Sequence, residues 1–528
     1  MFVKREKEDG FSSRGRYNKN YLCWLIQTKM ESVKKQRLER SQRSKQLQRN
    51  LEEPGAGVTT TKKMIVAAVE NSESGAKQSA VLDLMKSPVV ELNYCNFDFI
   101  HQLRPLKKES ASETSVFFAK LTKPPVGHSN EVEVSVKLSL HTKDLQQNNS
   151  LPMERLNYQV IANTIILNGW SPHLIAYVAS FSCSVDQLKN IKDISAIQNI
   201  KQDLRPVLAK IDSAEHQLNH ILKQLEVLDQ MDERVKETLR YQQTREKMET
   251  DAGELLLIAD MYDKDSLDFL ITEKAHNAKS LGDWLDAQTQ NSIQLNLMQL
   301  KSIVFQILYT FEVFNRINFR HNDAHVNNVL IENWSDDKHM SPISMYNVDG
   351  VMFQVPTKSN FVKLFDFDRS SFSCDPSAMH PNNVGLINEY KKHLPVNQPQ
   401  GPNLPNRCDN TLLENHPYLC KLAGSCNTID KKHDTFLTMR AIQFEMKNVM
   451  NNDAAAQTLF TWLDKQLQGA VKYVWKQGNG LWLRPEHIPT DEEMPSTLQM
   501  LRSGFFDEFK IKPTVVPNAV VYSLPLAL

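Results

Sequence analysis

The sequence predicts an α+β protein of two lobes, with a helical hairpin inserted into the first lobe. Three observations support this prediction: strands with alternating apolar residues occupy the first part of the chain, amphipathic helices occupy the second part, and a separate helical pattern interrupts the first part. We expect a basic tail over residues 1–62, the first lobe over 63–275 with the hairpin at 185–250, and the second lobe with a C-terminal tail over 276–528.

The first lobe contains the clearest strand of the chain, over residues 131–140. Valine and leucine alternate there with Ser135, Lys137 and Ser139, so one face of the strand is apolar and the other is polar. A helix is predicted over 153–167, after a proline that suits the first helical turn. Further strands are predicted over residues 96–100, 115–121, 173–181 and 254–275.

Residues 185–250 are predicted to form the inserted hairpin. Apolar residues recur there every three or four positions, with Gln, Lys and Glu between them. Pro206 is expected to kink or break the first helix, because proline has no N–H for the helical hydrogen bond. The apolar stripe is accounted for by packing between the two helices, and we also expect this hairpin to bind a partner.

The second lobe is predicted to be mainly helical. Residues 371–430 are rich in proline and are expected to be loops. Helices are predicted over 281–287, 297–314, 433–450 and 454–475, and short strands over 329–331 and 361–365.

Composition excludes several classes of protein. Lys+Arg 62 balance Asp+Glu 62, so bulk charge does not favour nucleic acid or an anionic membrane. The exception is the stretch 31–50, with a net charge of +5 from seven basic and two acidic residues, which fits a solvated tail or a nucleic-acid patch. No long apolar run or signal peptide is evident, and the seven cysteines are an odd number, so we expect an intracellular protein, not secreted, with free thiols.

Two polar segments carry the chemistry. The sequence HNDAHVNN over residues 321–328 follows a long helix, and KLFDFD over 363–368 ends the second short strand. A carboxylate such as Asp323 can orient an attacking hydroxyl and accept its proton. An amide and a second carboxylate, Asn328 and Asp366, can hold Mg²⁺ on phosphates because hard divalent cations prefer oxygen ligands.

This pattern, H-x-D-x-x-x-x-N followed by D-F-x, resembles the catalytic and metal loops of the protein kinase superfamily. The resemblance implies a bilobal protein-kinase-like fold with ATP and Mg²⁺ as cofactors. It makes Asp323 the catalytic carboxylate and makes Asn328 and Asp366 the metal ligands. It also implies that Asp434 is a buried helix aspartate bracing the catalytic loop.

Upstream residues extend the resemblance to the nucleotide site. The sequence VSVK ending at Lys137 resembles the V-A-I-K strand, which implies that Lys137 grips the phosphates of ATP and takes part in catalysis. Glu154 would brace this lysine, and Tyr158 follows it at the spacing seen in casein-kinase-like enzymes. Residues 271–274 would form the hinge beside adenine, with Glu273 and Lys274 binding the cofactor.

The chain is most similar to iridovirus-type serine/threonine kinases of large DNA viruses. HND, His325, DFD and the late sequence FFDEF at 505–509 carry this similarity, which extends over about residues 90–510. It implies phosphoryl transfer from ATP to Ser/Thr hydroxyls of a protein substrate, in the host cytoplasm or the virion.

Departures from the kinase pattern leave two alternatives open. No glycine occurs in RPLKKESASET over 104–114, where a Gly-rich phosphate loop would lie. Asn322, His325 and Asp368 replace the usual Arg, Lys and Gly, and no A-P-E follows. One alternative is a small-molecule phosphotransferase of the aminoglycoside or choline type, which often shows H-x-D-x-H-x-x-N. The other is a catalytically weak pseudokinase scaffold.

Overall fold

The computed structural model describes the chain in fourteen stretches and single residues. These are 95, 97, 100–106, 115–121, 133–142, 151–191, 194–290, 294–336, 341–372, 432–467, 474–477, 480–483, 493–511 and 521–525. The described residues form two compact units, of which one is Arg205–Tyr262 and the other contains those up to Leu204 and from Asp263 onward. The predicted tail over 1–62 and most of the loop region 371–430 lie outside the described residues.

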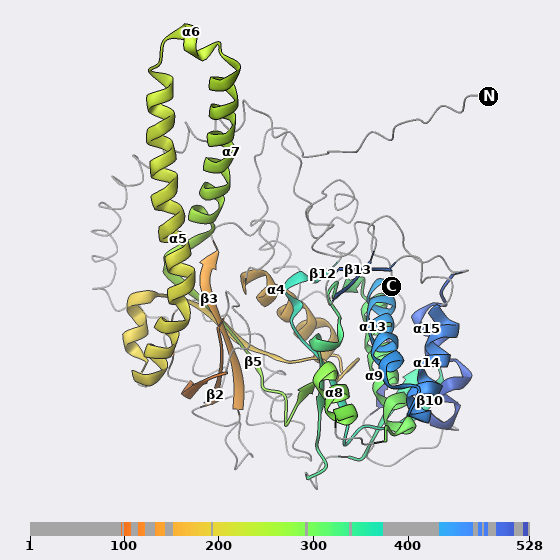
Figure 1. The fold of residues 1–528 in the computed structure, drawn as a ribbon. Helices are drawn as coiled ribbons and strands as arrows, with labels where there is room; N and C mark the ends of the chain where they lie inside the picture. Colours follow the sequence, from red (N-terminus) through yellow and green to blue (C-terminus); the bar gives the residue numbers. More distant parts are fainter. Residues whose placement is uncertain are drawn as a thin grey trace, which may run out of the picture. The chain divides into compact units, whose positions relative to one another are not determined.

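The unit Arg205–Tyr262 is a hairpin of two long helices, in agreement with the helical periodicity. α5 (Ile194–Asp229) and α7 (Leu239–Met261) run side by side and are joined by the short α6 (Glu233–Lys236) (Figure 1). The Tyr241 hydroxyl donates to the Leu228 carbonyl over 3.3 Å, and the Arg245 guanidinium pairs with Asp229. These contacts hold the ends of the two helices together.

Two predictions about this region need correction. Pro206 does not break α5, which continues through it although proline removes one backbone hydrogen bond, while a kink at this position stays a prediction. The helix buries Leu204 before the proline and Ile211 after it, and this burial offsets the lost bond. Residues 254–261 are the end of α7 rather than a strand, because a short apolar run does not by itself distinguish a helix from a strand.

A five-stranded sheet forms the first part of the second unit. Its apolar alternation is as predicted, since Val134, Val136 and Leu138 on β3 (Glu133–Thr142) are fully buried while Lys137 lies on the opposite face. The helix α4 (Leu151–Ile161) and the π-helical turn η1 (Ala162–Ile166) follow β3. The strand order is β1 (Ile100–Pro105), β2 (Ser115–Leu121), β3 (Glu133–Thr142), β5 (Tyr262–Glu273) and β4 (Tyr177–Ser184).

Cys95 and Cys183 form a disulfide, which corrects the expectation that all the thiols are free. Their Cα atoms are 4.9 Å apart, and Cys183 is a buried residue of β4. Phe97 lies edge-on against Phe181 and Phe269 with ring centroids 5.4 and 5.3 Å away. The odd cysteine count could not reveal this bond, because any two of seven cysteines can pair. Cys95 is therefore fastened to the sheet covalently, and Phe97 by aromatic packing.

The remaining described part of this unit is built from helices and small sheets, which makes the protein α+β as predicted. The helices are α8 (Leu281–Gln290), α9 (Leu297–Arg316), α13 (His433–Val449), α14 (Ala454–Leu467) and α15 (Thr497–Leu501). The strands are β6 (Lys279–Ser280), β7 (Phe319–Arg320), β8 (Val329–Glu332), β9 (Ile343–Val348), β10 (Val351–Pro356), β11 (Phe361–Leu364), β12 (Ser371–Phe372), β13 (Val474–Gln477), β14 (Gly480–Leu483), β15 (Lys510–Ile511) and β16 (Val521–Ser523).

Two differences from the prediction concern strands. The hairpin of β9 and β10 was not predicted, although its turn is an Asp-Gly pair, Asp349–Gly350, with positive φ at both residues. The helix predicted to extend to 475 ends at Leu467, and Val474–Gln477 pairs instead with β14. At Asp349–Gly350 the turn sequence was the signal, and helical periodicity does not report on it.

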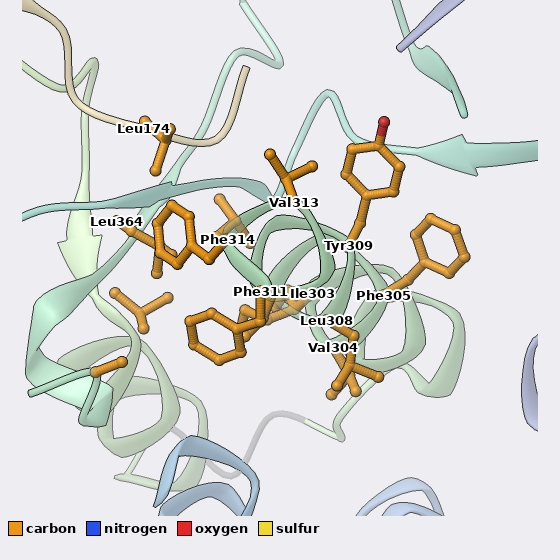
Figure 2. Close-up of a cluster of buried hydrophobic side chains, with 14 of the residues drawn as sticks. Leu174, Ile303, Val304, Phe305, Leu308, Tyr309, Phe311, Val313, Phe314 and Leu364 are labelled. Atoms are coloured by element: carbon orange, nitrogen blue, oxygen red, sulfur yellow. The ribbon is translucent and has the colours of Figure 1, made fainter. Parts of the chain in front are cut away.

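The helix α9 is the centre of the core. Figure 2 shows its side chains, including Phe305, Tyr309 and Phe314, gathered with Leu174 and Leu364 from elsewhere in the chain. By length and composition α9 could cross a membrane, but 83% of its apolar window is buried inside the protein, as in the core helix of a globular domain. α9 therefore packs against β11, the strand that leads into the acidic segment, and β8 buries Val329 and Ile331 in the same core.

A buried histidine connects three separated parts of this unit. His173 is fully buried, its Nδ1 lies 3.0 Å from the Val362 carbonyl, and its Nε2 lies 2.7 Å from the Tyr346 hydroxyl. Because a carbonyl can only accept, Nδ1 carries the proton and Nε2 accepts from Tyr346. Burial lowers the pKa of His173 to about 3, so the ring is neutral at physiological pH.

We expect this histidine to make the protein less stable in mild acid. The unfolded chain takes up a proton as the pH falls through 6.5, the ordinary pKa, whereas folded His173 stays neutral down to about pH 3. From about pH 7.5 to pH 5.5, His173 should remove about 1.4 kcal/mol from the free energy of unfolding measured in urea. His173→Phe should lose that part of the pH dependence, and the exposed-site control His216→Gln should retain it. If wild type and His173→Phe lost equal free energy of unfolding between about pH 7.5 and pH 5.5, buried neutral His173 would not be the cause of the acid sensitivity.

Candidate active site

One lysine ammonium brings together the three segments that the sequence singled out. Lys137 Nζ on β3 lies 2.7 Å from Glu154 Oε2 on α4 and 2.8 Å from Asp366 Oδ1, just after β11. The side chain of Glu154 is 3% exposed, and those of Lys137 and Asp366 are 22% and 31% exposed. Residues 229 positions apart thus form a partly buried ion pair.

The charges in this cluster stabilise one another unequally. Burial favours a neutral amine, but the carboxylates of Asp366 and Glu154 outweigh it and raise the pKa of Lys137 well above its usual value. Burial opposes ionisation of Asp366 as well, yet the nearby ammonium lowers the pKa of Asp366. Glu154 is the more deeply buried carboxyl, and burial raises its pKa to about 8 despite Lys137. At neutral pH, Lys137 and Asp366 are therefore the firmly charged pair.

Strand pairing explains why Asn328 and Asp366 converge. β8 and β11 are antiparallel, and their register places Val329 opposite Leu364. The residues just outside this pair, Asn328 and Phe365, must then face each other, and the Phe365 N–H donates to the Asn328 carbonyl over 3.3 Å. Asp366 is the next residue along the chain. The two predicted metal ligands thus lie at the same end of one strand pair.

The loop before β8 is fixed by side chains from elsewhere in the unit. The buried carboxylate of Asp434, in the first turn of α13, accepts the N–H groups of His321 and Asn322 over 2.7 and 2.9 Å. His321 Nε2 lies 2.9 Å from the carbonyl of Phe365, to which it donates. Asp434 therefore makes the contacts expected of a brace for the loop, and both backbone groups of Phe365 are bound to that loop.

Asp323 lies within this loop and is partly exposed. Its carbonyl accepts the His325 N–H over 2.8 Å and the Asn328 amide Nδ2 over 2.9 Å. Its carboxylate is 21% exposed and lies 3.9 Å from His325 Nε2. The preceding residue, Asn322, has a φ of 65°, a left-handed conformation that asparagine tolerates. The backbone thus links Asp323 to Asn328, and Asn328 to the Asp366 segment.

The donor set suits a magnesium–nucleotide complex. Because Nδ2 of Asn328 donates to Asp323, its Oδ1 is the atom available to accept or to bind a cation. Two of the three N–H groups of Lys137 point to carboxylates, which leaves the third for a phosphate oxygen. Within the described ranges no three His, Cys, Asp or Glu side chains cluster to hold a metal. Mg²⁺ held by one or two protein oxygens together with phosphates needs no such cluster.

The two predicted hinge residues lie in a different set of contacts. Glu273 Oε2 accepts from Lys363 Nζ over 3.0 Å and from the Ala176 N–H over 3.1 Å. Lys274 pairs with Glu133, and its ammonium lies 4.8 Å from the centre of the Phe118 ring. The structure does not join either side chain to the Lys137 cluster among the described contacts. Their role beside adenine stays a prediction.

Sequence reasoning missed one residue that the structure places beside the Asp366 segment. Asn157, on α4, donates to the carbonyls of Phe367 and Ser370. Tyr158, noted only for its spacing, has its hydroxyl 3.3 Å from the Asp366 N–H, which donates to it. The signal that could have revealed Asn157 is its position three residues after Glu154, on the same face of the helix.

Comparisons with known proteins find a kinase-like relative over a small part of the chain. No protein-family model matches. The chain is 33% identical over 94 residues to a protein of Acanthamoeba polyphaga mimivirus that carries a provisional description as a serine/threonine-protein kinase. The match spans 17% of this chain and 20% of the viral protein. This relative supports a kinase-like assignment, and the iridovirus-type similarity stays a prediction.

Two solved structures give only distant likenesses. One is a crystal structure described as a kinase domain, 12% identical, with a TM-score of 0.29 over 79% of this chain and 99% of that one. The other is WaaP in complex with acyl carrier protein, 9% identical, with a TM-score of 0.24 over 69% of this chain and 87% of that one. TM-scores of this size do not decide the fold, so the functional interpretation of this chain rests on the geometry of the site.

We expect Asp434→Asn to destabilise the protein through the loop that it braces. The amide presents an N–H₂ group to one of the two backbone N–H donors, which is left buried without an acceptor. The free energy of unfolding should fall by about 1–3 kcal/mol in urea titrations. Asp283 lies in the first turn of α8 but is exposed, so Asp283→Asn is a matched control with a much smaller effect. Equal effects of the two changes would contradict the bracing role.

Proposed function

We propose that this protein transfers the terminal phosphoryl group of ATP, with Mg²⁺, to Ser/Thr hydroxyls of a protein substrate. The observation that carries the proposal is the Lys137 ammonium between Glu154 and Asp366, beside a strand pair that brings Asn328 next to the Asp366 segment. A cation, two oxygen ligands and a nearby carboxylate are the groups that phosphoryl transfer needs.

Each residue has a distinct role in this reaction. Bound Mg²⁺ would neutralise charge on the phosphates. Asn328 Oδ1 and the Asp366 carboxylate hold that ion, and Lys137, kept in place by Glu154, donates to phosphate oxygens. Asp323 orients the acceptor hydroxyl and takes its proton as the oxygen–phosphorus bond forms and the bond to the departing ADP oxygen breaks.

A small-molecule acceptor is the second candidate, and a specific observation favours it. His325 is 43% exposed and lies 3.9 Å from Asp323, in the H-x-D-x-H-x-x-N pattern that small-molecule phosphotransferases often show. The chemistry at phosphorus is the same in both cases. The two candidates differ in the acceptor, which is decided by offering both kinds.

The test is phosphoryl transfer from radiolabelled ATP by the full chain. Purified protein is incubated with Mg²⁺ and generic protein acceptors, with aminoglycosides and choline, or with no acceptor. Asp323→Asn removes the proton acceptor and should lower kcat about 10²–10⁴-fold. Asp366→Ala should lower activity and raise the Mg²⁺ requirement. Labelling of protein supports the first candidate, and labelling of small molecules alone supports the second.

A matched control separates these effects from general damage. Asp507→Asn changes an aspartate whose side chain is 64% exposed, and it should retain wild-type activity. Full activity of Asp323→Asn or Asp366→Ala would overturn the residue assignments. A wild type that labels nothing, and that ATP with Mg²⁺ does not stabilise in thermal unfolding, would identify a scaffold without catalysis.

A further inference from the structure

The helix that carries Glu154 also holds the turn that follows Asp366. Asn157 is fully buried on α4, and its amide Nδ2 lies 2.7 Å from the Phe367 carbonyl and 3.3 Å from the Ser370 carbonyl. These carbonyls lie at the beginning of the single 3₁₀ turn η4 (Phe367–Arg369) and immediately after it. One side chain therefore spans the whole turn.

The hydrogen-bonding partners determine which way this amide points. Both neighbours are carbonyl oxygens, which only accept, so the amide must present its nitrogen to them. Within the described part of the chain, the Asn157 Oδ1 atom is buried and has no hydrogen-bond partner. A buried oxygen without a partner lowers stability, so the net gain in stability from this asparagine is small. Asn157 differs from an apolar residue in that both N–H groups of its amide bind carbonyls of the same turn.

The turn begins at a residue with a left-handed backbone conformation. The φ and ψ of Asp366 are 65° and 64°, in a region that Asp, like Asn, adopts more readily than other non-glycine residues but less readily than the helical region. Such conformations persist where surrounding contacts determine them fully. Asn157 fixes the carbonyls after Asp366, the Tyr158 hydroxyl accepts the Asp366 N–H, and Lys137 holds the carboxylate.

We propose that Asn157 is a positioning residue that keeps Asp366 in the orientation required to bind Mg²⁺. Glu154, Asn157 and Tyr158 lie at positions i, i+3 and i+4 of α4 and so share one face of the helix. Through this face, α4 orients both the phosphate-binding lysine and the metal ligand. The inference deepens the proposed function and rests on it for its catalytic readout.

The test replaces Asn157 with leucine and, in a second variant that adds no bulk, with alanine. Both changes take the Asn157 donor from the Phe367 and Ser370 carbonyls, which lowers stability, and remove the unsatisfied Oδ1, which offsets part of that loss. The melting temperature should therefore fall modestly, and somewhat more for alanine, which leaves a cavity. The Mg²⁺ concentration for half-maximal phosphoryl transfer at saturating ATP should rise about tenfold or more, as found for residues that orient metal ligands. Amide hydrogen exchange in peptides covering residues 365–372 should become faster in both variants.

Gln159→Leu is the matched control. Gln159 is equally buried on the same helix, and its amide Nε2 donates to the Tyr177 hydroxyl of β4 over 3.3 Å. Whatever this change does to the melting temperature, it should alter neither the Mg²⁺ requirement nor exchange at 365–372. A rise in both readouts for Gln159→Leu that matches Asn157→Leu would overturn the specific role of Asn157.

The two readouts separate this inference from the proposed function. Unchanged exchange at 365–372 in both Asn157 variants would overturn the inference whether or not the protein is active. If exchange at 365–372 is faster in the Asn157 variants but their Mg²⁺ requirement equals that of the wild type, then Asn157 holds the turn without affecting how Asp366 binds Mg²⁺. That result also overturns the inference. If the wild type transfers no phosphoryl group, the proposed function fails, and the exchange measurement alone decides whether Asn157 holds the turn.

Discussion

The ammonium group of Lys137 lies between two carboxyl groups that reach it from different elements, Glu154 on α4 and Asp366 after β11. Asp366 compensates its charge and Glu154 offers it a buried hydrogen-bonding oxygen, so the sheet, the helix and the strand pair are constrained together. The second constraint is the backbone of Phe365, bound on one side by His321 and on the other by Asn328. Together these contacts fix the positions of the acidic side chains relative to the lysine.

Secondary structure and candidate site residues could be predicted from the sequence where neighbouring residues form a regular pattern. Alternation placed Lys137 opposite a buried face because side chains in a strand point to either side in turn. The polar segment ending at Asn328 and the turn at Asp366 could be assigned together because each adjoins a predicted strand. Their convergence follows from the antiparallel register of those strands, which the sequence does not specify. The contact of Asp434 with the loop was foreseen only through the family resemblance.

Other features could not be derived from local patterns. Which cysteine pairs with Cys95 depends on the tertiary structure, and whether α5 continues through Pro206 depends on burial at positions distant from the proline. The apolar residues before Met261 fit a helix and a strand equally well. The turn Asp349–Gly350 is the exception, because its Asp-Gly sequence is typical of a two-residue hairpin and was overlooked. Asn157 was missed since its partners are more than 200 residues away.

The shared face of α4 has a consequence for how the site can be controlled. Because Glu154, Asn157 and Tyr158 project from one side of a rigid helix, a rotation or a slide of that helix would break their contacts together rather than one at a time. Intermediate states with only part of the site assembled would then be scarcely populated. Because Lys137 pairs with Glu154 on this helix, a compound or a protein that displaced α4 and a nucleotide held by Lys137 would oppose each other's binding, although the two would occupy different places.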